Sequence, residues 1–161
     1  PLLSTPDKAT YHMLTRCLDA IPAYGAGGWR GWSADTNLRY FLECPPWGLH
    51  HGGQKEPPAE PSGCAGASKR LRDALDLALW QSNPYDYFGD LLAENAYGKK
   101  QSFFATPHTV AELTARMLMD GDNRDTRILT VCDPCVGTGR LLLHASTYSL
   151  RLYGQHIDPL M

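Results

Sequence analysis

The stretch Asp133-Pro134-Cys135-Val136-Gly137-Thr138-Gly139-Arg140 decides the fold, because it separates an apolar run from a second periodic segment. Residues 128–132 predict a buried strand, and residues 140–150 have the apolar spacing of a helix. A second strand-like run covers residues 152–157 and is followed by Asp158. Strand, glycine turn, helix and strand together predict a βαβ nucleotide-binding unit.

The glycine turn also predicts a kind of ligand. Gly137 and Gly139 remove side chains where the backbone bends sharply and a ligand approaches it closely. The start of the following helix favours an anionic group, either a carboxylate or a phosphate. Asp133 would repel a pyrophosphate but would accept hydrogen bonds from a cationic amino group. S-adenosylmethionine carries both charges on its amino-acid end and fits this pattern. The alternative without a ligand is a tight turn that Asp133 caps.

Composition narrows the class of protein. The chain has 161 residues, of which 43% are hydrophobic and 20% charged, as in globular proteins. A net charge of −2 gives no support for a broad basic surface that would bind nucleic acid. No apolar run approaches the roughly 18 residues of a membrane span, so no membrane association is expected. Five cysteines at irregular spacing fit reduced thiols and a cytoplasmic location.

Metal sites are not predicted. The motif Cys132-x-x-Cys135 is a candidate redox or zinc half-site, but we expect both thiols to pack as small apolar residues around the turn. Zinc binding through Cys44, Cys64 and His50 or His51 lacks a second C-x-x-C or H-x3-H spacing.

The first third of the chain predicts a helix and a long loop. Thr5 is the predicted N-cap of a helix that ends at Pro22, and its inward face carries apolar residues. Those residues are Leu14, Cys17, Leu18 and Ile21. Residues 39–42 predict a short strand, and the segment 44–67, dense in proline and glycine, predicts a surface loop.

Three further helices are predicted before the glycine turn. Ser68 is expected to cap the first, which continues through Leu79, and the second covers residues 86–97. The third has Thr106 as its N-cap and Pro107 at its first position. Its predicted inward face consists of Val110, Leu113, Met117 and Leu118. The predicted divisions are an N-terminal helix and loop region, a helical segment and the first βαβ unit, at 1–67, 68–126 and 127–161.

Three motifs occur in an order that resembles a known family. They are Asp86-Tyr87-Phe88-Gly89-Asp90-Leu91-Leu92, Phe104-Ala105-Thr106-Pro107, and the turn from Asp133 to Gly139; residues 153–159 look like the second strand and its end. This part of the chain resembles the modification subunit of type I restriction-modification systems and related adenine-N6 DNA methyltransferases. The resemblance covers about half of the chain and is carried mainly by the turn with its upstream Thr-Pro.

The resemblance implies a Rossmann-like, S-adenosylmethionine-dependent methyltransferase fold with DNA as the partner. It implies a cofactor-binding set of Phe104, Thr106, Pro107, Asp133, Pro134, Gly137, Gly139, His156 and Asp158. His156 stands where the family usually has Asp or Glu for the ribose hydroxyls, and an imidazole offers a single acceptor there. Asp158 would substitute if the end of the strand were shifted.

No catalytic residue is predicted, because the family's Asn-Pro-Pro-aromatic loop does not occur in these 161 residues. In the family this loop accepts the hydrogens of a flipped-out adenine amine, which then takes the methyl group directly. Asn83-Pro84-Tyr85 lacks the second proline and precedes the turn. We expect an α/β fold that is incomplete, with only its first βαβ unit, completed by further chain, a partner subunit or a second copy. Alone, this chain is not expected to methylate.

Two rival functions remain. A nicotinamide- or flavin-binding oxidoreductase predicts a third glycine where Leu142 stands. A non-catalytic binding or assembly module derived from a methyltransferase is favoured by His156 and by the absent catalytic loop.

Overall fold

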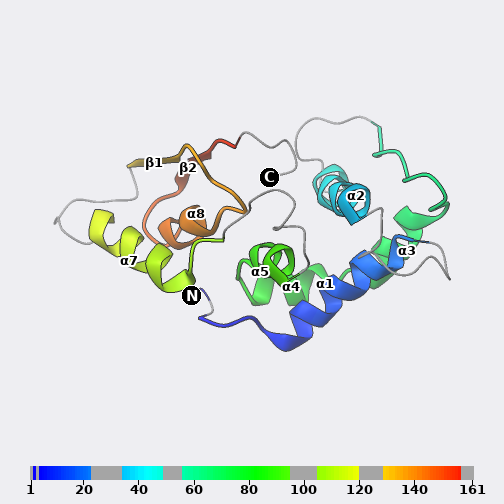
Figure 1. The fold of residues 1–161 in the computed structure, drawn as a ribbon, viewed down its shortest axis with the longest axis horizontal. Coiled ribbons are helices and arrows are strands. Elements are labelled where there is room, and N and C mark those ends of the chain that lie inside the picture. The colour runs from blue at the N-terminus through cyan, green and yellow to red at the C-terminus, as the bar shows by residue number, and fades with distance from the viewer. Residues whose placement is uncertain are drawn as a thin grey trace. The chain divides into compact units, whose positions relative to one another are not determined.

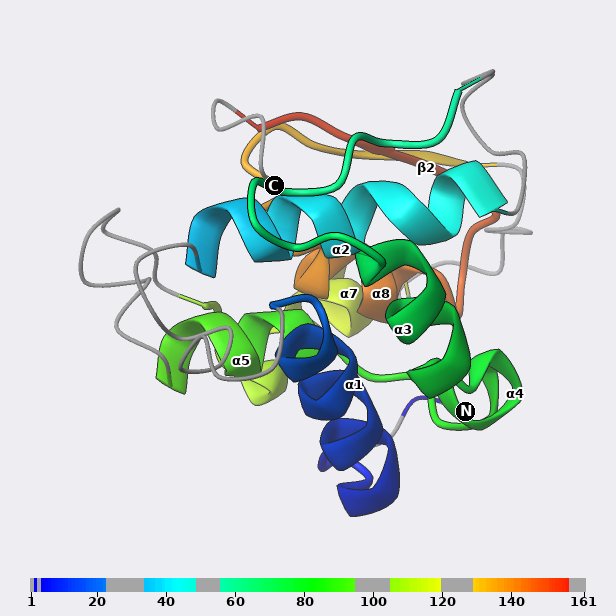
Figure 2. The ribbon, with the colours of Figure 1, turned by 90° about the vertical axis from the view of Figure 1, so that its right-hand side faces the viewer.

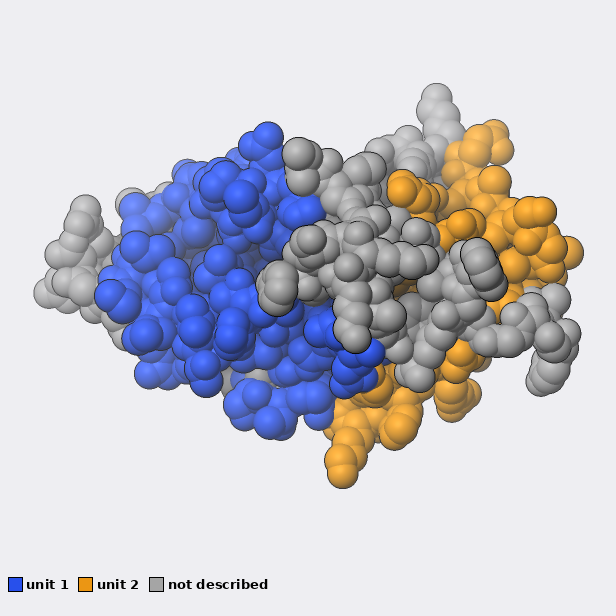
Figure 3. Space-filling model, in the orientation of Figure 1, with its two compact units in different colours: residues 1–6, 83–161 blue, residues 7–82 orange. Residues whose placement is uncertain are grey.

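A computed structural model describes residues 2, 4–22, 34–48, 56–94, 105–119 and 129–156. The elements are α1 Lys8–Ala20, α2 Ala34–Gly48, α3 Ala67–Ala74, α4 Leu77–Ser82, α5 Tyr87–Glu94, α7 His108–Met119, β1 Thr130–Asp133, α8 Arg140–Ala145 and β2 Arg151–Gly154 (Figure 1). They form two compact units, a helical unit of residues 7–82 and a unit of residues 1–6 and 83–161 that contains the sheet (Figure 3). None of the helices among the described residues is long and apolar enough to cross a bilayer.

In the helical unit, α1 begins later than predicted. Asp7 rather than Thr5 is its N-cap, because the Asp7 carboxylate accepts the Thr10 amide at 2.8 Å. The predicted inward face is confirmed, since Leu14, Cys17, Leu18 and Ile21 are all fully buried.

The strand predicted at residues 39–42 is wrong, because this segment lies inside α2. The buried residues of α2 follow helical spacing rather than the alternation of a strand; they include Asn37, Leu38, Tyr40 and Phe41. The helix continues to Gly48, so the predicted loop begins later than Cys44. Residues 56–66 form turns and irregular chain as expected, while His50 and His51 lie outside the described residues.

The single helix predicted after the loop is two helices. Leu75 has an extended backbone with ψ of 118°, which separates α3 from α4. The N-cap of α3 is Gly66, not Ser68. The cap interaction comes from Glu60, whose carboxylate accepts the amides of Gly66 at 2.7 Å and Ser68 at 2.8 Å. A distant side chain therefore satisfies the free amides at the start of this helix.

In the second unit, β1 and β2 are parallel neighbours and lie side by side (Figure 2). Helix α8 lies between them in the chain. Residue pairs across the strands alternate in exposure: Val131 and Leu152 are half-buried, whereas their neighbours Cys132 and Tyr153 are exposed. The prediction of a buried β1 is therefore wrong for the part that the structure describes. A strand is buried on both faces only when helices cover both sides of its sheet. Helix α8 packs on one face of this two-stranded sheet and buries the residues of that face only.

Helix α8 ends at Ala145, five residues before the predicted end. The Ser146 and Thr147 hydroxyls donate to the carbonyls of Leu143 and His144, at 2.6 Å and 2.9 Å. Such bonds compete with helix continuation. The chain then turns toward β2.

Helix α7 buries a different face from the predicted one. Ala111 and Ala115 are buried, whereas Val110, Leu113, Met117 and Leu118 are 48%, 57%, 74% and 72% exposed. Small side chains allow α7 to approach α8 closely, and this contact outweighs the larger apolar residues in setting the orientation. The helix begins at His108, so Pro107 rather than Thr106 precedes it. The Pro107 carbonyl accepts the amides of Val110 and Ala111, both at 3.0 Å.

Candidate functional site

The predicted glycine turn follows β1 directly. Gly137 and Gly139 have φ of 55° and 88°, in the left-handed region that favours glycine, as the sequence predicts. The Gly139 amide closes the turn by donating to the Val136 carbonyl at 2.8 Å. Apart from Gly139 and its two chain neighbours, no heavy atom of the described residues lies within 4 Å of the position that a Gly139 Cβ would take. The backbone is therefore open to a ligand on this side.

The turn is tied to the end of β2. The Val136 amide donates to the Gln155 carbonyl at 3.0 Å, and the Gln155 amide donates to the Asp133 carbonyl at 2.9 Å. A Cβ on Gly154 would lie 2.8 Å from Val136 Cγ2, so Gly154 lets the turn sit against the strand. Sequence reasoning did not assign this role, although a glycine inside a strand signals such a close approach.

The two carboxylate oxygens of Asp133 have different surroundings. Oδ1 accepts the Cys135 amide at 2.9 Å, which is the capping role of the alternative without a ligand. Oδ2 is buried and accepts no hydrogen bond from the described residues. A buried carboxylate oxygen without a donor is costly, and a cationic amino group would satisfy it.

The other predicted site residues are partly brought together. Thr106 lies just before α7, and its carbonyl accepts Arg140 Nη1 at 3.0 Å, which joins this segment to the start of α8. His156 is half-buried and follows Gln155, whose backbone holds the turn. Phe104 and Asp158 lie outside the described residues.

A small hollow lies beside Asp133 and Pro134. It measures about 160 Å³ and is lined mainly by apolar side chains of α7, β1 and α8. Ligand pockets are usually about 300 to 1,000 Å³. The described residues therefore supply only part of the space that a ligand of cofactor size needs.

Helix α8 is short, so the predicted preference of its start for an anion has less structural support than Asp133. The helix has six residues, and Gly139 caps it without a side-chain hydrogen bond. A short helix aligns few peptide dipoles. The features of this turn that favour a ligand are therefore Asp133 and the open side at Gly139.

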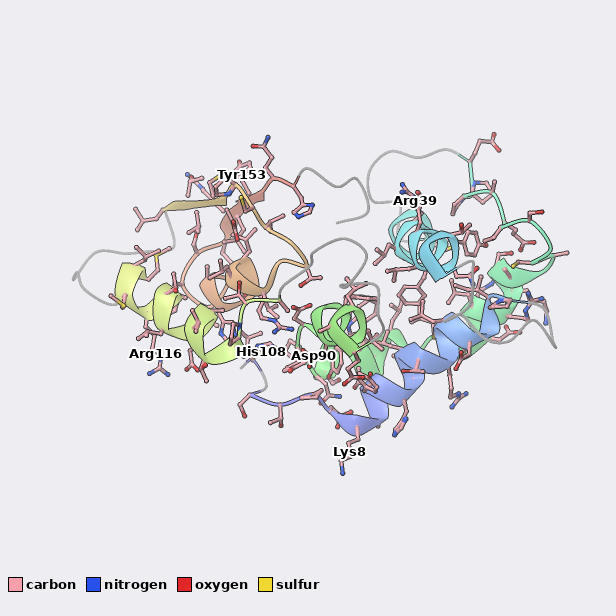
Figure 4. All side chains as sticks on the ribbon, in the orientation of Figure 1. Lys8, Arg39, Asp90, His108, Arg116 and Tyr153 are labelled. Atoms are coloured by element: carbon pink, nitrogen blue, oxygen red, sulfur yellow. The ribbon has the colours of Figure 1, made fainter. Side chains whose placement is uncertain are left out.

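Three ring side chains gather next to Thr106. The His108 ring stacks on Tyr85 with centroids 4.4 Å apart, and His108 Nδ1 is 3.2 Å from His144 Nε2 (His108 is labelled in Figure 4). Burial lowers the pKa of both histidines, and the charge of Arg140 adds to this effect. Burial, with the hydrogen bond to Asp90, raises the pKa of Tyr85. Both imidazoles therefore favour the neutral form.

The thiols of the turn do not pack as expected, because Cys132 and Cys135 are both exposed. Among the residues that the structure describes, no group of three or more His, Cys, Asp or Glu side chains is arranged to hold a metal ion.

Comparison with known proteins identifies the segment that contains the turn. Residues 81–160 match the N-6 DNA Methylase family. This methylase segment, as we call residues 81–160, includes all three motifs from which the sequence predicted a resemblance, and the match supports the adenine-N6 DNA methyltransferase family. No curated protein and no solved structure matches the chain.

Proposed function

We propose that the methylase segment binds S-adenosylmethionine as the cofactor-binding part of an adenine-N6 DNA methyltransferase. The observation that carries this proposal is Asp133 Oδ2, which is buried and has no donor among the described residues, beside a left-handed glycine turn that is open at Gly139. In this proposal, residues 127–161 form the first βαβ unit of a Rossmann-like fold, and residues 68–126 lead into it. The likeness to the type I modification subunit supports this arrangement.

The residues present fit the amino-acid end of the cofactor. Asp133 Oδ2 would accept a hydrogen bond from its ammonium group, and the backbone of Gly137 and Gly139 would face its methionine part. Thr106 and Phe104 would flank it, and His156 and Asp158 are the candidates near the ribose. When bound, S-adenosylmethionine supplies an electrophilic methyl group for direct transfer to an amine.

We propose DNA as the partner, which the family match favours. We propose the cytoplasm as the location. The 161 residues contain no Asn-Pro-Pro-aromatic loop. We therefore propose a donor-binding role for this chain, with the groups that accept the adenine amine supplied by further chain or by a partner subunit.

The second candidate is a non-catalytic binding or assembly module. The absence of the catalytic loop from these residues and the imidazole of His156 in place of a carboxylate both favour it. This candidate predicts that the chain binds no methyl donor.

Calorimetric titration with S-adenosylmethionine, S-adenosylhomocysteine and NAD tests the proposal. We expect the two adenosyl amino acids to bind and NAD not to bind. Asp133→Asn should weaken their binding about 10- to 100-fold, the usual effect of losing a charged hydrogen bond. Glu112→Gln is the matched control, because it removes an exposed carboxylate on α7. Binding of NAD alone would support the oxidoreductase, and binding of none of the three would support the non-catalytic module.

A further inference from the structure

A buried ion-pair network connects the glycine turn and the start of α8 to the start of α5. Arg140 Nε is 2.7 Å from Asp86 Oδ2, and Arg140 Nη2 is 2.8 Å from Asp90 Oδ1. The side chains of Arg140 and Asp86 are only 8% and 4% exposed. One arginine at the start of α8 therefore holds two carboxylates from the start of α5.

The remaining oxygens of both carboxylates are also satisfied. Asp86 Oδ1 accepts the Gly89 amide at 2.8 Å, and Asp86 Oδ2 also accepts the Thr138 hydroxyl at 2.7 Å. The Tyr85 hydroxyl donates to Asp90 Oδ2 at 2.6 Å (Asp90 is labelled in Figure 4). A fully hydrogen-bonded buried pair adds little net stability, but it fixes geometry, and breaking one member is costly.

Glycine is required where α5 meets this network. A Cβ on Gly89 would overlap Asp86 Oδ2 and Arg140 Nη2. In the motif Asp86-Tyr87-Phe88-Gly89-Asp90, the two aspartates accept hydrogen bonds from one guanidinium group. Gly89 leaves the space that this group needs. Arginine suits this position because its planar fork reaches several acceptors at fixed angles.

The network reaches the turn itself. Thr138, between the two glycines, donates to Asp86, and Arg140 follows Gly139 and donates to the carbonyl of Thr106. On the other side, the backbone of Val136 is held by Gln155. The turn is thus fixed from both sides, while Asp133 Oδ2 and the open side of Gly139 are left for a ligand.

We infer that Asp86, Thr138 and Arg140 are positioning residues that preform the methyl-donor site. They touch no donor atom themselves. They hold the turn in its bound shape before the ligand arrives, which lowers the ordering cost of binding. This inference depends on the proposed function of the turn as a donor site.

Four variants test the inference in the 161-residue chain. Arg140→Lys keeps the charge but loses the fork, and Thr138→Val removes one hydroxyl from a side chain of the same shape. Thr138→Ser restores that hydroxyl and serves as the rescue. Arg116→Lys is the matched control, because Arg116 pairs with Glu112 on the exposed face of α7. Circular dichroism first establishes a temperature at which every variant is folded.

Two readouts are taken at that temperature. Hydrogen exchange of peptides covering residues 133–140, without ligand, should become faster in Arg140→Lys and Thr138→Val but not in Thr138→Ser or Arg116→Lys. Calorimetry should show S-adenosylmethionine binding weakened about tenfold in Arg140→Lys and about three- to tenfold in Thr138→Val. Thr138→Ser and Arg116→Lys should bind like the unaltered chain.

The outcomes separate the two proposals. If the unaltered chain binds the donor while Arg140→Lys and Thr138→Val bind it equally well, the inference is overturned and the proposed function stands. The same holds if exchange at residues 133–140 does not change. If the unaltered chain binds no donor, the proposed function fails, and the positioning role in donor binding fails with it.

Discussion

Replacing Gly89 by alanine gives a test in which two physical effects predict opposite signs. Helix propensity favours alanine over glycine in a helix such as α5 by about 1 kcal/mol. A Cβ at this position would overlap Asp86 Oδ2 and Arg140 Nη2 and lie 2.8 Å from Asp86 Cγ. Breaking a buried ion pair costs about 3 to 5 kcal/mol. We therefore expect Gly89→Ala to lower the free energy of unfolding by about 2 to 4 kcal/mol.

Urea denaturation followed by far-ultraviolet circular dichroism measures this change. Ala93→Gly, at an exposed position of the same helix, is the control and should cost about 1 kcal/mol from propensity alone. In an Asp86→Ala background, Gly89→Ala should cost less than in the unaltered chain, because the Asp86 carboxylate is gone and only the overlap with Arg140 Nη2 is left. A Gly89→Ala chain as stable as the unaltered one would refute the close packing of Gly89 against this ion pair.

Four further predictions concern other parts of the chain. Gly154→Ala should push Val136 and the turn away from β2. We expect this to lower the free energy of unfolding by about 1 to 3 kcal/mol and to weaken donor binding. A urea midpoint and a donor affinity that both stay unchanged would contradict this prediction. Because the folded-state pKa values of His108 and His144 are lowered, the unfolded chain binds more protons, so stability should fall as pH drops below about 6.5. The double variant His108→Gln/His144→Gln should flatten this decline in urea titrations between about pH 7.5 and 5, and an equally steep decline would exclude the histidines as its cause. Glu60→Gln should cost about 0.5 to 1 kcal/mol through the weakened cap of α3, whereas Glu56→Gln, at an exposed position, should cost nothing in the same assay. Brief alkylation read by mass spectrometry should label the exposed thiols of Cys132 and Cys135 first. Cys17 should be labelled late, because burial shields its thiol and raises its pKa to about 11. Early labelling of Cys17 would contradict its burial.

Local signals in the sequence predicted the turn well. The Gly-x-Gly pattern after an apolar run predicted a sharp turn after the strand, with Asp133 at the strand's end. In the structure both glycines of this turn are left-handed, a conformation that glycine adopts readily. The inward face of α1 was also predicted, since its four apolar residues follow one helical period.

Features that depend on distant contacts were not predicted. The orientation of α7 is set by Ala111 and Ala115 packing on a neighbour, which outweighs the larger apolar residues of the same helix. The cap of α3 comes from Glu60, several residues away in an irregular segment. The carboxylate partners of Arg140, Asp86 and Asp90, lie 54 and 50 positions earlier in the chain, and no spacing rule links them to the arginine.

The central claim is that Asp133 and the glycine turn hold the amino-acid end of a methyl donor. A crystal structure of the chain with S-adenosylhomocysteine tests it most directly. We predict the ligand's amino group within hydrogen-bonding distance of Asp133 Oδ2, with its carboxylate against the backbone of Gly137 to Gly139. A turn filled by the protein's own side chains, or a ligand bound elsewhere, would contradict the claim.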